Sequence, residues 1–235
     1  MARRPLEREQ VCLDGGRRTT QLMRDPLGAE AFVALYFDPS DPDLGQKVLS
    51  LAPTPGYCVF VDITGSTAMK DQELYRWASR IHNAFANVST FMPDGSYPLK
   101  SIGDALLYFI PKSHLGSTHQ VPLRLFAGLA SVVHDSDPIF PEQKAAIVSG
   151  EAYELTFIRD RPDVYGKDVD LAARLASVAK SRELVMNRAF YEEVKAEYDR
   201  VGPGAGFVEV RLIEQRSAVP LKGFAAPVEV FVYHR

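Results

Sequence analysis

The sequence predicts an α+β protein in which helices pack on one face of an antiparallel or mixed sheet. From residue 56 onward helical and strand-like segments alternate, yet two tight hairpins are present, and hairpins join antiparallel strands. Before residue 56, turn signals such as Asp41-Pro42-Asp43 separate short apolar runs. We therefore expect a short N-terminal extension over residues 1–55, with two short helices, and one domain over residues 56–235.

The composition is that of an ordinary globular protein, with 46% hydrophobic and 24% charged residues. The net charge of -3 gives no reason to expect nucleic acid or an acidic membrane surface as a partner. The two cysteines, Cys12 and Cys58, form neither a zinc spacing nor a disulfide framework. No apolar run approaches the ~18 residues of a membrane span, and the N-terminus lacks the apolar core of a signal peptide. We expect a cytoplasmic protein without membrane contact.

The domain begins with a strand followed by a helix. Residues 57–63 form a β-branched and aromatic run, which predicts a strand. Thr64 or Ser66 is placed to cap the next helix. The apolar stripe of that helix is Leu74, Trp77, Ile81, Phe85 and Val88.

A tight hairpin and a second helix come next. The strands at residues 98–102 and 105–110 are separated only by Gly103-Asp104, a two-residue turn. Residues 123–133 carry apolar side chains at helical spacing.

The rest of the domain continues the alternation of strands and helices. The expected elements are strands at 144–153 and 154–158 broken near Gly150, a helix at 168–179 with a stripe of Leu171, Leu175 and Val178, a strand at 183–186, a helix at 188–198, and strands at 207–214 and 227–233.

Two aspartates end apolar strands, and they carry most of the functional information. Asp62 and Asp104 each place a carboxylate where burial costs free energy unless something pairs with it. If the hairpin lies beside the first strand, both carboxylates reach the same edge of the sheet. They would then repel each other unless a cation lay between them. The alternatives are that Asp62 only caps a helix and that Asp104 is only a turn residue.

The pair of carboxylates indicates a site for divalent metal. Hard carboxylate oxygens suit Mg²⁺ or Mn²⁺. Two such ions about 4 Å apart are the usual arrangement for an in-line phosphoryl displacement, because one activates the attacking hydroxyl and the other neutralises the leaving phosphate. The glycine-containing turn and helix start after Asp62 suit a phosphate group, which accepts hydrogen bonds from backbone N–H groups.

Four segments in order resemble the motifs of class III nucleotidyl cyclases, and together they span roughly residues 56–234. They are Phe60-Val61-Asp62-Ile63-Thr64-Gly65-Ser66-Thr67, Lys100-Ser101-Ile102-Gly103-Asp104-Ala105, Asp163-Val164-Tyr165-Gly166-Lys167-Asp168-Val169-Asp170-Leu171-Ala172-Ala173-Arg174-Leu175, and Leu221-Lys222-Gly223-Phe224 with Pro227-Val228-Glu229-Val230. One such motif would be weak evidence, whereas four in register are strong. The resemblance implies a ferredoxin-like class III cyclase domain.

The resemblance also implies a role for individual residues. Asp62 and Asp104 would bind two Mn²⁺ or Mg²⁺ ions, with the carbonyl of Ile63 as a further ligand. Arg174 would stabilise charge on the α-phosphate during cyclisation, as a fixed cation does beside developing negative charge. The implied substrate contacts are Phe60, Thr64, Gly65, Ser66 and Thr67, with residues 64–67 around the triphosphate, and Lys100 and Asp163 at the base.

In this family the metal pair and the base-and-arginine set come from opposite subunits. The resemblance therefore implies a head-to-tail homodimer with composite active sites, acting on a nucleoside triphosphate.

One position departs from the family pattern. Asp170 stands where most of these cyclases have an asparagine that orients the ribose, and aspartate lacks the donor and adds negative charge. Asp170 and Arg174 are four residues apart on one helix face, so an intrahelical salt bridge is the alternative to a ribose contact. Lys222 is either a phosphate contact or a solvated lysine beside a turn.

The implied reaction is attack of the 3′-hydroxyl of a nucleoside triphosphate on its own α-phosphorus. The chain as a whole resembles the free-standing pyrimidine cyclases of bacterial anti-phage signalling systems, which favours UTP ahead of CTP. Adenylate cyclase is the alternative, because Lys100 and Asp163 look like an adenine-reading pair. A catalytically inactive nucleotide-binding domain and a different two-metal phosphoryl-transfer enzyme are alternatives of other classes.

Overall fold

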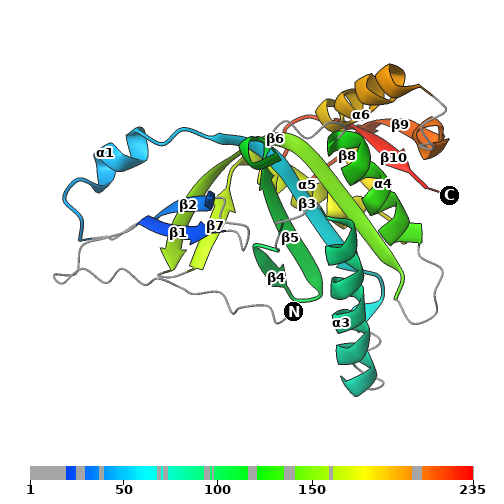
Figure 1. Ribbon diagram of the computed structural model, residues 1–235, viewed down its shortest axis with the longest axis horizontal. Helices are drawn as coiled ribbons and strands as arrows, with labels where there is room; N and C mark the ends of the chain where they lie inside the picture. The colour runs from blue at the N-terminus through cyan, green and yellow to red at the C-terminus, as the bar shows by residue number, and fades with distance from the viewer. Residues whose placement is uncertain are drawn as a thin grey trace, which may run out of the picture.

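The protein forms one mixed sheet with helices on both faces (Figure 1). The computed structural model describes residues 20–24, 30–36, 40–67, 70, 74–92, 96, 98–115, 121–134, 141–158, 161–202 and 208–234. Within those residues ten strands join the sheet, and its main order is β4-β5-β3-β6-β8-β10-β9. Cys12 and Phe207, which were used in the predictions above, lie outside the described residues.

Strand β3 (Thr54–Ile63) is central to the sheet. It pairs antiparallel with β5 (Ala105–Pro111) on one side and with β6 (Gln143–Ile158) on the other. β4 (Lys100–Ile102) joins β5 through the predicted two-residue turn, in which Gly103 has a φ of 66° that favours glycine. The predicted first strand and hairpin are confirmed.

The other half of the sheet contains parallel and antiparallel pairs. β8 (Leu184–Asn187) runs parallel to β6, whereas β10 (Val228–Tyr233) is antiparallel to both β8 and β9 (Ile213–Val219). This confirms a mixed sheet.

The strand predicted at 207–214 is displaced along the chain. A 3-10 helix, η3 (Val208–Leu212), occupies most of that range, and β9 starts at Ile213, which pairs with Tyr233. The pairing with β10 therefore sets where β9 begins.

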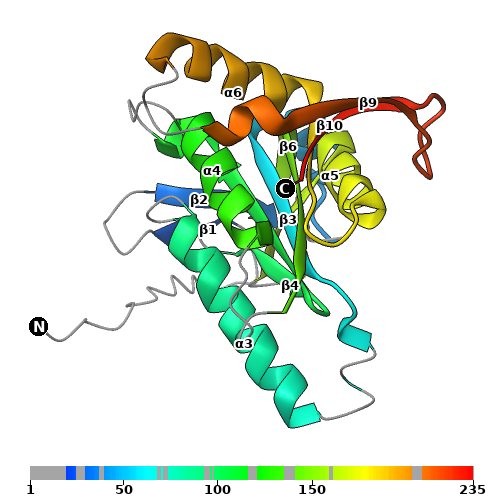
Figure 2. The same cartoon turned by 90° about the vertical axis from the view of Figure 1, so that its right-hand side faces the viewer.

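Helices cover both faces of the sheet, so the prediction of helices on one face is wrong. α3 (Leu74–Phe91), α4 (Val121–His134) and α6 (Arg188–Val201) pack on one face, and α5 (Lys167–Val178) packs on the other (Figure 2). The reason lies in β3, where successive side chains point to opposite faces and both sets are apolar.

Only part of each predicted helical stripe is buried. In α5 Leu171 and Leu175 are buried. In α3 Val88 is buried and Phe85 packs against the core, whereas Trp77 and Ile81 are half-buried. Leu74, the first residue of α3, is 68% exposed, and Val178, the last residue of α5, is 39% exposed. Terminal turns extend beyond the sheet, so their apolar side chains meet less of the core.

The described part of the N-terminal region contains two strands and one helix, whereas the sequence predicted two short helices. β1 (Thr20–Arg24) and β2 (Glu30–Tyr36) form an antiparallel pair, and α1 (Leu44–Leu49) follows. β2 runs parallel to the outer part of β6, which also pairs with β7 (Arg161–Tyr165) (Figure 1). Pairing with a distant strand decides this structure, so local turn signals did not show it.

β6 runs for 16 residues without the predicted break at Gly150. Gly150 pairs with Gly56, and a Cβ atom there would overlap the carboxylate of Asp168 on α5. Asp168 Oδ2 accepts a hydrogen bond of 2.9 Å from the amide of Glu151. The glycine thus lets α5 approach the sheet closely and does not end the strand.

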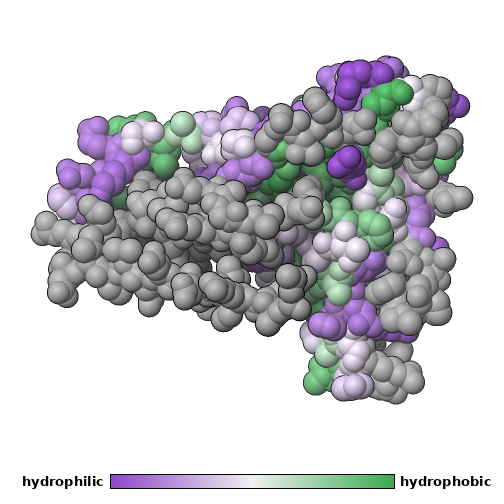
Figure 3. Space-filling view, viewed as in Figure 1, coloured by the Kyte–Doolittle hydropathy of each residue, from purple (hydrophilic) through white to green (hydrophobic). Residues whose placement is uncertain are grey.

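Figure 3 shows a surface on which hydrophilic and hydrophobic residues are mixed. In Figure 3 the end of the molecule formed by α6, at the upper right, is strongly hydrophilic. Among the described residues, every helix is too short or too polar to cross a lipid bilayer.

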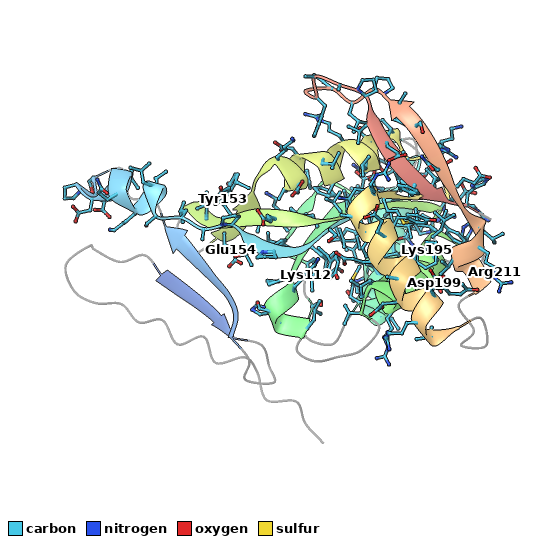
Figure 4. The ribbon with its side chains drawn as sticks, turned by 90° about the horizontal axis from the view of Figure 1, so that it is seen from above. Lys112, Tyr153, Glu154, Lys195, Asp199 and Arg211 are labelled. Atoms are coloured by element: carbon cyan, nitrogen blue, oxygen red, sulfur yellow. The ribbon has the colours of Figure 1, made fainter. Side chains whose placement is uncertain are left out.

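A polar network joins β3, β6 and α6 at the end of β3 opposite Asp62. Lys112 of η1 (Lys112–Leu115; Figure 4) donates to Ser149 Oγ at 2.9 Å and to Glu193 Oε1 at 2.7 Å. The hydroxyl of Tyr57 donates to Glu193 Oε2 at 2.7 Å, and burial together with Glu193 raises the pKa of Tyr57. Hydrogen bonds satisfy these partly buried groups, which indicates a structural role.

The close approach at Gly150 leads to a prediction about stability. Gly150→Ala is expected to lower the free energy of unfolding by about 1–3 kcal/mol, because the new methyl group overlaps the Asp168 carboxylate. The measurement is urea denaturation followed by circular dichroism.

The double variant Gly150→Ala/Asp168→Ala should lose less stability than the sum of the two single losses, because the truncated side chain leaves room for the methyl group. The control is Gly45→Ala in α1, where a Cβ meets nothing within 4 Å. Strict additivity of the two changes would contradict this account of the glycine.

Candidate active site

The structure brings Asp62 and Asp104 to the same end of neighbouring strands. Asp62 is paired in register with Ala105, the residue directly after Asp104. The two side chains are partly buried, with exposures of 29% and 20%. Two carboxylates this close raise each other's free energy unless positive charge lies nearby.

Two lysines supply positive charge to this pair, and sequence reasoning missed both. Lys144 Nζ lies 3.4 Å from Asp62 Oδ2, and Lys70 Nζ lies 3.9 Å from Asp104 Oδ1. Lys144 is the residue of β6 that pairs in register with Asp62. The signal available in the sequence for Lys144 was a single cation directly before the apolar run at residues 145–148.

The donor atoms at this edge fit a hard divalent cation. The described residues contain no group of three or more His, Cys, Asp and Glu side chains suited to a metal. A metal here would therefore take its ligands from the two carboxylates, from backbone oxygens such as that of Ile63, and from the phosphates of a substrate. Mg²⁺ and Mn²⁺ accept such all-oxygen sets.

The segment after Asp62 is a tight turn that leads into a helix. The amide of Thr64 donates to the carbonyl of Glu142 at 2.9 Å, and Gly65 is exposed with a φ of 72°. Ser66 and Thr67 already have helical conformation. Within the described residues the buried hydroxyl of Thr64 has no hydrogen-bond partner, so Thr64 does not cap the helix. The predicted turn and helix start are present, and their binding of phosphate stays a prediction.

Two further predicted residues lie in ordinary environments. Phe60 is 7% exposed and its side chain packs in the core on the α5 side of the sheet. Lys222 is exposed in the turn between β9 and β10, which agrees with the alternative that it is a solvated lysine beside a turn.

Lys100 and Asp163 meet although they are 63 residues apart. Lys100 Nζ donates a hydrogen bond to Asp163 Oδ2, and the amide of Val164 donates to Asp163 Oδ1 at 2.8 Å. The contact joins the edge strand β4 to β7. It places a cationic donor and an anionic acceptor side by side, and their contact with a base stays a prediction.

Tyr165 is a third member of this group that sequence reasoning did not assign. Burial raises the pKa of its phenol, and the charge of Asp163 and a hydrogen bond to it raise that pKa further. The signal available in the sequence was its spacing, because residues two apart on a strand share one face.

Asp170 and Arg174 both lie exposed on α5. The amide of Asp170 donates to the carbonyl of Gly166 at 3.0 Å, within the first turn of the helix. Among the described ion pairs none joins Asp170 to Arg174, so the intrahelical salt bridge is not formed. Nor does either side chain make a described hydrogen bond or ion pair with Asp62 or Asp104.

Comparison with known proteins identifies this architecture. No model of a known protein family matches the chain. An adenylate cyclase of Glutamicibacter nicotianae is 30% identical over 175 residues, which cover 73% of this chain and 40% of that protein. The chain thus spans less than half the length of this curated relative.

Solved cyclase structures share the fold. The adenylyl cyclase CyaB of P. aeruginosa superposes with a TM-score of 0.61 at 18% identity, covering 79% of this chain and 96% of CyaB. The guanylyl cyclase Cya2 superposes with a TM-score of 0.60 at 16% identity, covering 78% of this chain and 93% of Cya2. The chain therefore has the fold of class III cyclase catalytic domains.

The contact between Tyr165 and Asp163 leads to a prediction about pH. In Asp163→Asn the pKa of Tyr165 is expected to fall toward its ordinary value of 10.0, because the neighbouring negative charge that disfavours the phenolate is gone. The measurement is an NMR titration of tyrosine labelled with ¹³C at Cζ.

The control for this titration is Asp199→Asn on α6, where the aspartate pairs with Lys195. That variant should leave the Tyr165 titration unchanged. An unaltered Tyr165 pKa in Asp163→Asn would mean that the two side chains do not interact in solution.

Proposed function

We propose that this protein is a nucleotidyl cyclase. The 3′-hydroxyl of a nucleoside triphosphate attacks its own α-phosphorus, the bond to the β-phosphate breaks, and a 3′,5′-cyclic mononucleotide and pyrophosphate are released. The observation that carries the proposal is the meeting of Asp62 and Asp104 at one end of β3 and β5, on a fold shared with adenylyl and guanylyl cyclases.

Asp62, Asp104 and the carbonyl of Ile63 are the proposed ligands of two Mn²⁺ or Mg²⁺ ions. Such ions, when bound, lower the pKa of an attacking hydroxyl and neutralise the phosphates. The backbone of residues 64–67 holds the triphosphate, and the exposed Gly65 allows close approach. Lys144, at 3.4 Å from Asp62, adds a cation at the same place.

The proposed active unit is a head-to-tail homodimer. Asp170 and Arg174 are exposed, and among the described residues neither forms an ion pair, which suits a guanidinium that reaches a substrate held by a second copy. There Arg174 would stabilise the charge that develops on the α-phosphate. Asp170 would lie near the ribose.

The Lys100–Asp163 pair is the proposed reader of the base. Uracil offers an acceptor at O4 beside a donor at N3, so the lysine donates and the carboxylate accepts. Tyr165 contacts Asp163 and takes up space beside the pair, which favours the smaller pyrimidine ring. We take UTP as the substrate, with CTP next, and cyclic UMP as a second messenger of anti-phage defence that acts on a separate effector.

ATP is the second candidate substrate. Adenine offers an acceptor at N1 beside a donor at N6, which satisfies the same lysine and carboxylate. The relative named adenylate cyclase also favours ATP.

The proposed placement of Asp62 and Arg174 on opposite subunits of one active site leads to a prediction about mixed dimers. Asp62→Ala and Arg174→Ala should each reduce metal-dependent turnover by at least about 100-fold, since even changes around a metal site cost 10- to 100-fold. Mixed and reassembled, the two variants should recover about a quarter of the wild-type sites, because half of the dimers are mixed and each has one intact site. The measurement is cyclic nucleotide formed per protein.

The control mixes Asp62→Ala with Asp104→Ala. These lesions lie in the same half-site, so no intact site forms and activity stays absent. Recovery of activity in this control would contradict the assignment of both aspartates to one half-site. Unchanged turnover in both Asp62→Ala and Asp104→Ala would contradict the two-metal proposal.

The base-reading group leads to a prediction about substrate choice. With equal ATP, GTP, CTP and UTP and Mn²⁺, cyclic UMP should be the main product by mass spectrometry. Tyr165→Ala should raise the ratio of cyclic AMP to cyclic UMP, because it removes the phenol beside Asp163.

Tyr153→Ala is the matched control, since Tyr153 pairs in register with Tyr165 and is equally exposed, at 38% against 37%. It should leave the product ratio unchanged. Predominant cyclic AMP from the wild-type protein would refute the pyrimidine assignment and favour ATP.

A further inference from the structure

Lys70 makes two contacts that link the candidate metal site to helix α3. It follows the turn at residues 64–67, and its Nζ lies 3.9 Å from Asp104 Oδ1. The same Nζ lies 4.7 Å from the centroid of the Trp77 ring on α3. Trp77 is the single tryptophan of the sequence.

We infer that Lys70 is an exchangeable cation of the active site. It neutralises Asp104 until a divalent ion binds there, and it then turns to the triphosphate. The inference rests on the metal and triphosphate sites proposed above, and it adds a residue that none of the four sequence motifs contains.

The exchange follows from the strength of the competing interactions. The Lys70 side chain is 37% exposed, and a contact of 3.9 Å at that exposure is a weak ion pair. A divalent ion coordinates the carboxylate directly with twice the charge, so it displaces the ammonium group. Once the ion is bound, like-charge repulsion drives Lys70 away from Asp104.

The triphosphate is the proposed destination of the displaced ammonium group. Two divalent ions carry four positive charges, and two of these offset the two aspartates. The remaining positive charge balances only part of the negative charge of a triphosphate, which therefore attracts further cations. Lys70 follows the turn proposed to hold the phosphates, and lysine carries its point charge on a flexible stem. The Lys70 Nζ lies over the Trp77 ring, so a displacement of the ammonium group changes the surroundings of that ring.

Removing the lysine charge should therefore change two affinities in opposite directions. Lys70→Met removes a competitor of the metal, so Mg²⁺ should bind more tightly. It also removes a partner of the triphosphate, so nucleotide should bind more weakly. A lysine that only stabilised the local structure would weaken both.

The test uses the whole chain of residues 1–235 and readouts that need no turnover. Mg²⁺ is titrated at constant ionic strength while the emission of Trp77 is recorded, and calorimetry gives the Kd. Nucleotide binding is measured at saturating Mg²⁺ with 3′-deoxy-UTP and 3′-deoxy-ATP, which lack the attacking hydroxyl.

In the wild type, Mg²⁺ should change the Trp77 emission, because Lys70 shifts over the ring. In Lys70→Met the Kd for Mg²⁺ should fall about two- to fivefold, the range of an exposed ion pair, and Mg²⁺ should change the emission little. The Kd for the better of the two analogues should rise about fivefold or more, as expected for loss of a charged hydrogen bond.

The matched control is Lys195→Met, which removes a lysine paired with Asp199 on α6 (Figure 4). It should leave both affinities and the Trp77 response unchanged. Asp104→Asn should abolish the response of Trp77 to Mg²⁺.

Three results would each overturn the inference. They are weaker or unchanged Mg²⁺ binding in Lys70→Met, an unchanged nucleotide affinity, and a wild-type Trp77 response in that variant. If the opposite shifts are seen but no triphosphate is cyclised, the exchange stands and the proposed function fails.

Discussion

The site depends on the electrostatic cost of placing two carboxylates at the ends of neighbouring strands. The register of β3 with β5 sets Asp62 beside Ala105 and so beside Asp104. A shift of one residue would turn Asp62 to the opposite face of the sheet, because side chains alternate along a strand. Lys144 of β6 pairs with Asp62, and Lys70, which follows the turn, pairs with Asp104; the two lysines offset the negative charge of the carboxylates. Lys70 is the more exposed of the two lysines and lies farther from its aspartate, which is why we propose that a divalent ion displaces it.

A second constraint is that the central strands are buried on both faces. β3 packs α3, α4 and α6 against one face and α5 against the other. Gly150 on β6 allows α5 to lie close to the sheet, where Asp168 of α5 accepts a hydrogen bond from the amide of Glu151. The opposite side of α5 is left exposed, and Asp170 and Arg174 lie there. The packing of one helix therefore separates the residues proposed for metal from those proposed for charge stabilisation.

Several site features were predictable because they depend on short stretches of chain. The Gly103-Asp104 turn gives a hairpin, and the apolar run before Asp62 gives a strand, so the two carboxylates could be placed at strand ends from local chemistry. Their meeting depends on the pairing of β3 with β5, which the sequence supplied only as a condition. The Lys100–Asp163 contact came only through the family resemblance, because the two residues are 63 apart. Lys70, Lys144 and Tyr165 were missed, since a lysine or a tyrosine acquires a role only from the side chain that packing sets beside it.

By itself the sequence determined the order of most elements, the hairpin, and the residue types that suit divalent metal and phosphate. These follow from apolar periodicity and turn chemistry, which act over a few residues. The tertiary structure alone decided the strands of the N-terminal region, the unbroken β6, the placement of α5 on the second face, and the absence of a salt bridge between Asp170 and Arg174. Each of these depends on hydrogen bonds or packing between segments distant in the chain, whose free energy outweighs local preference.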